Sequence, residues 1–256
     1  MRISRRHLMF ASAGVALPLT AAEPPQRSLF ELRFIRLRNG PENQRQRAVA
    51  FLEKYASLAK AAGSGQVGAF SSSIAEDGPY LLVISSFKSY ADLEACQTKL
   101  LANPEYVKAR AEWYAGGVAY EREDVRLLRA FPGYPTMTPP PTEGRQSSRV
   151  FELRIYELEN NVGLERKIRM FDEGETAIFV RAGMAPVFFG ETVFGPDAPS
   201  LIYMLGFNDL AAREQAGRAS GADPEWKRLG ATYSDVATVP NLTISFVNPL
   251  RFSDVR

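Results

Sequence analysis

The sequence predicts an α+β fold in which two tandem βαββαβ units pack as an intramolecular barrel with pseudo-twofold symmetry. Three observations support this prediction. Short motifs recur in register about 120 residues apart, the two copies show the same order of strand-like and helix-like patterns, and a proline-rich segment separates them. A period of this length indicates a duplicated domain and is too long for a solenoid repeat.

The internal repeat rests on three pairs of segments, each about 120 or 121 positions apart. The pairs are FELR at 30–33 and 151–154, LLVISSF at 81–87 and LIYMLGF at 201–207, and NPEY at 103–106 and DPEW at 223–226. Because all three pairs keep nearly the same spacing, one ancestral unit explains them together.

The first half of each copy predicts a strand, a helix and a second strand. The first strand, near 29–37 or 150–158, alternates large apolar and charged residues, as a half-buried strand does. A helix follows with an apolar stripe, which comprises Val49, Leu52, Tyr55, Ala59 and Ala62 or Leu164, Ile168, Phe171, Ile178 and Ala182. The next strand runs near 66–74 or 186–194 and ends at a Gly/Pro/Asp turn.

The second half of each copy predicts a central strand, a broken helix and a last strand. The strand at 80–87 or 200–207 is apolar on both faces, which is typical of a strand covered on each side. The helix begins at Ser89 or Asn208. It restarts at Asn103-Pro104 or Asp223-Pro224, where a capping side chain precedes proline. The last strand lies near 122–130 or 241–248.

This order is the ferredoxin-like, split βαβ arrangement. Its helices cover one face of the sheet, so two such sheets can bury their open faces against each other. We expect a signal peptide at 1–22, a first repeat at 27–131, a proline-rich linker at 132–148 and a second repeat at 149–253.

The first 22 residues resemble a twin-arginine export signal. Arg5 and Arg6 precede a modest apolar run from Leu8 to Leu19, and small residues follow at Thr20-Ala21-Ala22. An ordinary secretory signal is the alternative. Either one predicts a periplasmic or secreted protein, and no segment is long and apolar enough to span a bilayer.

Composition excludes several classes of function. Residues 1–22 hold three of the 31 basic residues and no acid, which leaves 28 basic against 29 acidic side chains. A nearly neutral chain with interspersed charges does not predict a nucleic-acid partner. The single histidine is His7 and the single cysteine is Cys96. We therefore predict no metal site, no cofactor and no Ser-His or Cys-His nucleophile.

The second copy resembles a domain of the NIPSNAP family, in the tandem form of exported bacterial proteins. The residues that carry the resemblance are FELR at 151–154 with Tyr156, MFDEGE at 170–175, PVFFGE at 186–191, YM at 203–204, LAARE at 210–214 and PEWK at 224–227. The family implies a dimeric α+β barrel fold but no agreed reaction. The segment 215–219 lacks the aromatic residue that the family usually has there.

Charged residues of the two first strands are candidate ligand-binding groups. If Phe30, Leu32 and Phe34 face the helices, then Glu31, Arg33, Glu152, Arg154 and Tyr156 face the barrel interior. There they would bind a small polar or acidic molecule. The alternative is a set of interior ion pairs that hold the two sheets in register.

Glu175 and Glu191 are the candidate catalytic residues. Glu175 interrupts an apolar helical stripe beside Gly174, and burial would raise the pKa of its carboxyl group toward the range of a general acid or base. Pairing with Arg181 or Arg154 is the alternative. Glu191 follows Phe188-Phe189-Gly190 and could face Glu175, with Arg181 and Tyr203 nearby as further ligand-binding candidates.

Three functions remain open at this point. The first is a binding or structural module with a small cavity. The second is a cofactor-free enzyme, of the oxygenase or isomerase type, with a carboxylate base. The third is a protein-interaction module, and a homo-oligomer is compatible with all three.

Overall fold

The computed structural model describes residues 26–143, 148–236 and 239–256. The first repeat consists of β1 (Leu29–Arg36), α1 (Gln44–Ala62), β2 (Val67–Ile74), β3 (Tyr80–Phe87), α2 (Tyr90–Ala102), α3 (Pro104–Ala115) and β4 (Arg122–Ala130). The second consists of β5 (Val150–Glu157), α4 (Asn161–Met170), the π-helix η1 (Phe171–Glu175), α5 (Thr176–Arg181), β6 (Ala185–Phe194), β7 (Ser200–Phe207), α6 (Leu210–Ala222), α7 (Pro224–Thr232) and β8 (Asn241–Pro249).

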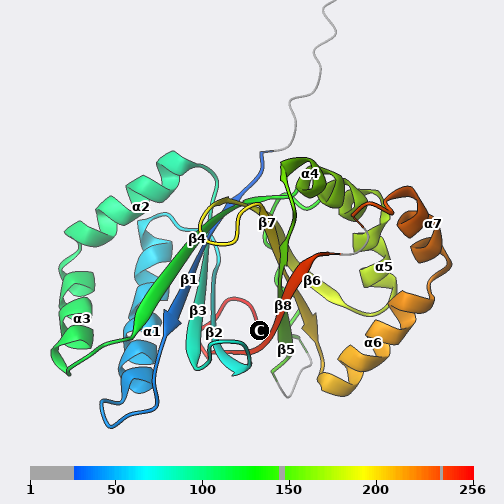
Figure 1. Ribbon diagram of the computed structural model, residues 1–256. Coiled ribbons are helices and arrows are strands. Elements are labelled where there is room, and N and C mark those ends of the chain that lie inside the picture. The colour runs from blue at the N-terminus through cyan, green and yellow to red at the C-terminus, as the bar shows by residue number, and fades with distance from the viewer. Residues whose placement is uncertain (1–25, 144–147, 237–238) are drawn as a thin grey trace, which may run out of the picture.

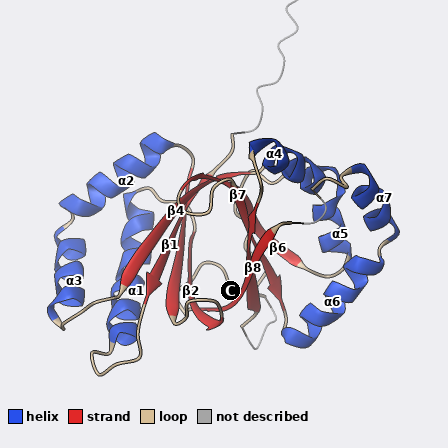
Figure 2. Ribbon diagram, viewed as in Figure 1, coloured by secondary structure: helices blue, strands red, loops and turns tan. Residues whose placement is uncertain are grey.

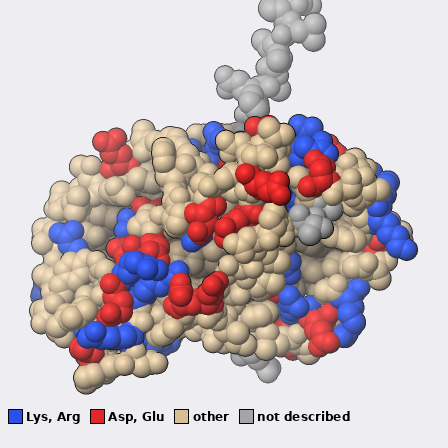
Figure 3. Space-filling view, viewed as in Figure 1, with Lys and Arg blue, Asp and Glu red and all other residues tan. Residues whose placement is uncertain are grey.

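The strands form the centre of the molecule, and the helices form two outer layers. Helices α1–α3 lie on one side of the strands and α4–α7 on the other (Figure 1). Coloured by secondary structure, the same view shows the strands enclosed between the two helical layers (Figure 2). On the surface of this face, positively and negatively charged side chains are interspersed (Figure 3). None of the helices in the described ranges is both long and apolar enough to cross a membrane.

The eight strands of the described chain close into one barrel in the order β1-β3-β2-β8-β5-β7-β6-β4. Each repeat therefore contributes a ferredoxin-like sheet, 4-1-3-2 or 8-5-7-6. Antiparallel pairs β2–β8 and β4–β6 join the two sheets. The predicted α+β fold with two tandem βαββαβ units in an intramolecular pseudo-twofold barrel is confirmed.

Capping side chains set where the helices begin. Ser89, Asn103 and Asp223 accept hydrogen bonds from backbone N–H groups in the first turns of α2, α3 and α7, which otherwise lack partners. For α6 the capping residue is Asp209, one position after the predicted Asn208, and its carboxylate accepts from the Ala212 N–H. A shift of one residue is typical of helix boundaries.

The inside of the barrel is packed with apolar side chains from both sheets. Phe30, Leu32 and Phe34 of β1 meet Phe151, Leu153 and Ile155 of β5 in a single buried cluster. Aromatic pairs cross the interface, with ring centroids 5.3 Å apart for Phe30 and Phe188 and 5.4 Å apart for Phe70 and Phe151. The two repeats therefore share one core.

The predicted orientation of β1 and β5 is therefore wrong. Glu31, Arg33, Glu152, Arg154 and Tyr156 lie on the helix-covered faces and not in the barrel interior. Alternation of residue types along a strand shows which residues share a face, but it does not specify whether that face meets the helices or the barrel interior. The central part of the interior joins the two sheets through apolar contact, whereas the space under the helices accommodates paired charges.

The two ends of the barrel differ. At one end, Met137 of the linker and Val255 of the C-terminal segment are buried in the interior cluster. Hydrogen bonds from Thr138 N–H to the Val187 carbonyl and from Asp254 N–H to the Val67 carbonyl hold these segments in place. The opposite end, where β1 and β5 finish, contains a cavity lined by charged residues.

Candidate functional site

A cavity of about 290 Å³ lies between the first repeat's sheet and its helices. Six aromatic residues contribute to its wall, which are Phe51 and Tyr55 of α1, Phe87 of β3, and Tyr106, Trp113 and Tyr114 of α3. The rings of Phe51 and Trp113 stack with centroids 4.6 Å apart. This wall favours a flat apolar group in the cavity.

The polar part of the cavity is an ion-pair network on β1. Arg33 binds both carboxylate oxygens of Glu31, each at 2.9 Å, and reaches Glu123 of β4 at 3.0 Å. Gln97 of α2 donates a further hydrogen bond to Glu31 at 3.2 Å. Burial lowers the pKa of Arg33, but the bonds and charge of Glu31 outweigh it and raise that pKa overall. The Glu31 carboxylate is thus already occupied by donors.

Tyr55 supplies the cavity with a neutral hydroxyl. Its oxygen lies 3.1 Å from the hydroxyl oxygen of Ser85. Burial, followed by the negative charge of Glu31, raises the pKa of Tyr55 to about 12. Since the phenol stays protonated at neutral pH, Tyr55 can donate or accept a hydrogen bond but does not act as a base.

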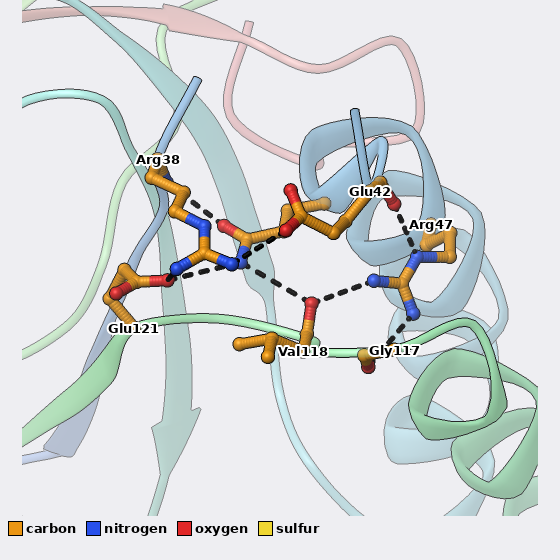
Figure 4. Close-up of polar contacts among 7 residues, drawn as sticks. Arg38, Glu42, Arg47, Gly117, Val118 and Glu121 are labelled. Carbon is orange, nitrogen blue, oxygen red and sulfur yellow. Dashed lines mark hydrogen bonds and ion pairs between the residues drawn. The ribbon is translucent and has the colours of Figure 1, made fainter. Parts of the chain in front are cut away.

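Arg47 of α1 binds the end of α3 and the segment that follows it, and Figure 4 shows its contacts with Gly117 and Val118 of that segment. Its guanidinium donates to the carbonyl oxygens of Trp113 at 2.8 Å and Val118 at 2.7 Å. A cation at the C-terminal carbonyls of a helix is favourable. The buried Gln44 also reaches the Val118 carbonyl, at 3.3 Å. These contacts fix Trp113 in the cavity wall.

The corresponding region of the second repeat is filled by a polar network. Glu152 is completely buried and pairs with Arg154 of β5 and Arg213 of α6. Arg154 donates to the hydroxyls of Tyr156 at 3.1 Å and Tyr203 at 3.2 Å. The Tyr203 hydroxyl donates to that of Tyr156 at 2.7 Å. Burial raises the pKa of Tyr203 well above its ordinary value.

Strand register explains why only one of these two regions is hollow. Arg33 lies opposite Val83, and its counterpart Arg154 lies opposite Tyr203. Two positions after each arginine, β1 has Ile35 where β5 has Tyr156. Tyrosine at both places occupies the volume that isoleucine and valine leave open in the first repeat.

Glu175 forms a second buried pair in the same half. Its carboxylate accepts a hydrogen bond from the Lys167 ammonium at 3.0 Å, and both side chains are at most 3% exposed. Burial raises the pKa of Glu175, while the charge of Lys167 opposes that rise. The helix passes through the π-turn η1 at this point, and Gly174 leaves helical geometry. The partner is neither Arg181 nor Arg154, because the π-turn aligns Glu175 with α4.

Two predicted residues lie away from both regions. Glu191 does not face Glu175 and instead accepts from Arg27 at 2.6 Å and Arg129 at 2.9 Å on the outside of the barrel. Arg181, with its side chain 48% exposed, pairs with Asp223 and Glu225. The structure thus brings together Glu31 with Arg33, and Glu152, Arg154, Tyr156 and Tyr203.

The residues that the sequence reasoning missed are mainly those of the helices. No sequence pattern marks Gln97, Trp113 or Arg47 as part of a binding site. Lys167 lies eight positions before Glu175, and the π-turn between them brings the two side chains together, so regular helical spacing did not indicate this pair. Aromatic enrichment of the segment 106–120 was the available signal for the cavity wall.

Comparison with known proteins identifies the second repeat. Residues 151–254 match the family model described as NIPSNAP. The second repeat is a NIPSNAP domain. No curated protein matches the chain.

Solved structures that cover nearly the whole NIPSNAP-containing chain share its fold. A candidate monooxygenase from Lactobacillus acidophilus is 13% identical over 87% of this chain and 94% of its own, with a TM-score of 0.58. One from Fusobacterium nucleatum is 6% identical over 89% and 94%, with a TM-score of 0.59. A NIPSNAP-like domain protein from Burkholderia xenovorans covers a smaller part, 41% of this chain and 89% of its own, at 22% identity and with a TM-score of 0.38. For the two candidate monooxygenases, identities this low mean that the likeness shows the fold alone.

Proposed function

We propose that the chain binds a small molecule with an aromatic or apolar body and a polar group in the cavity of the first repeat. The observation that carries this proposal is the aromatic cavity with a buried polar side, in a molecule whose other half is filled at the same place. Its volume, about 290 Å³, is near the lower limit of typical ligand pockets.

Unused hydrogen-bonding capacity supports a ligand with a polar group. The indole N–H of Trp113 is buried without an acceptor among the described residues. A buried donor without a partner is unfavourable by about 1–3 kcal/mol, so an acceptor on a ligand would relieve it. Arg110 also lines the cavity, and its guanidinium carbon lies 5.4 Å from the centroid of the Tyr106 ring.

The second repeat suggests the test, because Tyr203 fills the space there that Val83 leaves open in the first repeat. We expect Val83→Tyr to weaken binding of 1-naphthol at least about tenfold, since the new ring occupies ligand space. Trp226→Phe in every protein leaves Trp113 as the fluorescent reporter. Val125→Tyr is the matched control, because it adds the same side chain at an exposed position of β4. Equal 1-naphthol affinity in Val83→Tyr and the control would disprove the proposal, as would no binding by the parent protein.

A cofactor-free oxygenase acting in this cavity is the second candidate. Its support is the candidate monooxygenases among the structures that share the fold, together with an anthrone oxidase-like protein with a TM-score of 0.53 at 13% identity. The occupied Glu31 carboxylate favours binding without catalysis. Oxygen uptake with anthrone, abolished by Val83→Tyr, would establish the enzyme instead.

We also propose that the protein is exported by the twin-arginine route. The signal-like residues lie outside the described part of the chain, so this proposal rests on their sequence. Arg5→Lys combined with Arg6→Lys should leave the precursor in the cytoplasm, as measured by fractionation. Unchanged processing would indicate a general secretory signal.

A further inference from the structure

The open end of the barrel contains a cavity of about 510 Å³ that shares no lining residue with the aromatic cavity. It lies where β1 and β5 end, opposite the end that Met137 and Val255 close. Three arginines and five carboxylates line it, together with polar groups of β3 and β8. Its chemistry is therefore unlike that of the aromatic cavity.

Arg126 is a buried charge on the inner face of the barrel. It lies opposite Leu32 in the β1–β4 ladder, and its side chain is 7% exposed. One guanidinium nitrogen, Nη2, donates to Asp197 at 2.7 Å, but Nε and Nη1 have no partner within the described residues. The guanidinium thus has two further donors for an anion.

A second arginine contacts the same aromatic ring as Arg126. The guanidinium carbons of Arg36 and Arg126 lie 5.4 Å and 5.2 Å from the centroid of the same ring, that of Phe34. The charge of Arg36 adds to the effect of burial in lowering the pKa of Arg126, although Asp197 opposes both. An anion bound to Arg126 would offset the positive charge that Arg36 adds near it.

The carboxylates of the cavity make a simple anion a poor ligand. Asp124 and Asp197 pair with arginines, whereas Glu76, Asp77 and Glu157 form no ion pair in the described part of the chain. Glu157 accepts a hydrogen bond from Asn241 at 2.8 Å and Glu76 accepts one from Thr243 at 3.2 Å, so each keeps its negative charge without a cation. Their negative charge would repel a plain carboxylate or phosphate. A ligand that also carries a cation satisfies both sets of groups.

We propose that this open end of the barrel binds a small zwitterion with the chemistry of a free α-amino acid. Its carboxylate binds Arg126, and its ammonium group binds the carboxylates that have no ion pair, with Glu157 at the end of β5 among them. The hydroxyls of Tyr80 and Ser245 lie on the same cavity wall. The Tyr80 hydroxyl is buried, and its interaction with Ser245 does not reach the geometry of a normal hydrogen bond, so a ligand could offer it a better partner.

Equilibrium dialysis of the full chain against an equimolar mixture of the twenty proteinogenic L-amino acids tests this site. We expect one or a few amino acids to be retained. The best-retained one should bind at least about tenfold more tightly than the same acid without its amino group, because a charged hydrogen bond is worth about this factor.

Two variants localise the binding. Arg126→Lys keeps the charge but removes the fork of donors, and should weaken binding about tenfold or more. Glu157→Gln should weaken binding of the amino acid several-fold but not of its des-amino analogue. Arg129→Lys, on the same strand and outside the cavity, is the control for Arg126→Lys, and thermal melting shows that each variant is folded.

Three results would overturn the proposal: no amino acid retained by the parent chain, a des-amino analogue that binds equally well, or full binding by both folded variants. Val83→Tyr, which fills the aromatic cavity, should bind the amino acid normally. The absence of binding in the aromatic cavity can thereby be distinguished from the absence of binding at the open end of the barrel.

Discussion

Lys167 and Glu175 form an ion pair in which both side chains are almost completely buried. Both side chains are buried in the second repeat, and the Lys167 ammonium lies 5.2 Å from the centroid of the Phe171 ring. Taking two ions out of water is unfavourable, and their mutual attraction offsets this only while both partners are present. Removing one partner leaves an unpaired buried charge and therefore lowers the free energy of unfolding.

Lys167→Met should make the free energy of unfolding strongly dependent on pH. Burial raises the pKa of Glu175, and without Lys167 that pKa rises further. A carboxyl group whose pKa is raised by folding stabilises the fold below its unfolded pKa, about 4.5, and this stability is lost as pH rises through the folded value. We expect a loss of about 3–5 kcal/mol at pH 7 and little loss near pH 4.

Urea denaturation at a series of pH values measures this effect. The double variant Lys167→Met with Glu175→Leu is the control, because replacing both ions by apolar groups removes the titrating carboxyl and restores much of the stability. A single variant that follows the pH profile of the parent protein would contradict the assignment.

The faces of β1 and β5 and the partner of Glu175 show how far single residues could be placed from the sequence. The period-two pattern of β1 and β5 predicted which residues share a face, and that grouping is correct. It could not show which face meets the helices, because both faces contain large side chains. Likewise the burial of Glu175 was predictable from its place in an apolar stripe. Its lysine partner depended on the π-turn, which no pattern of apolar residues indicates.

At the scale of elements, the start of α3 determines the shape of the aromatic cavity. Asn103 caps this helix by accepting from the N–H groups of Glu105 at 2.8 Å and Tyr106 at 3.2 Å, while Arg47 holds its other end. Tyr106, Arg110 and Trp113 follow on the cavity side. The Asn-Pro signal for this helix was readable from the sequence, and so were most helices and strands, because caps, prolines and periodicity agree there.

Asn103→Ala should lower the free energy of unfolding by about 1 kcal/mol, the usual effect of losing an N-cap side chain. It should also weaken 1-naphthol binding, because the first turn of α3 carries Tyr106. Lys108→Ala, at a side chain that is 78% exposed on the same helix, is the control and should change stability by less than about 0.5 kcal/mol. Guanidinium denaturation measures the free energy of unfolding of both variants. Equal losses for the two variants would contradict a capping role for Asn103.

At the scale of the whole molecule, neither sheet has a complete core of its own. The interior cluster draws on β1, β2, β3 and β4 as well as on the four strands of the second repeat. A separated repeat would expose this entire apolar face to water. The duplication thus supplies within one chain what a homodimer would otherwise provide.

Expression of residues 149–256 alone tests this dependence. We expect insoluble protein or a homodimer that rebuilds the barrel, as measured by size-exclusion chromatography with light scattering. A stable soluble monomer of this fragment would show that each sheet folds independently and that the barrel interface is dispensable.

The β2–β8 junction has a consequence for the order of folding. Its two strands are separated by more than 160 residues in the sequence, and pairing across such a distance is slow compared with local contacts. During synthesis the first repeat therefore emerges complete and must wait with its apolar face uncovered until β8 has left the ribosome. That interval is when the nascent chain is most prone to aggregate and most dependent on chaperones.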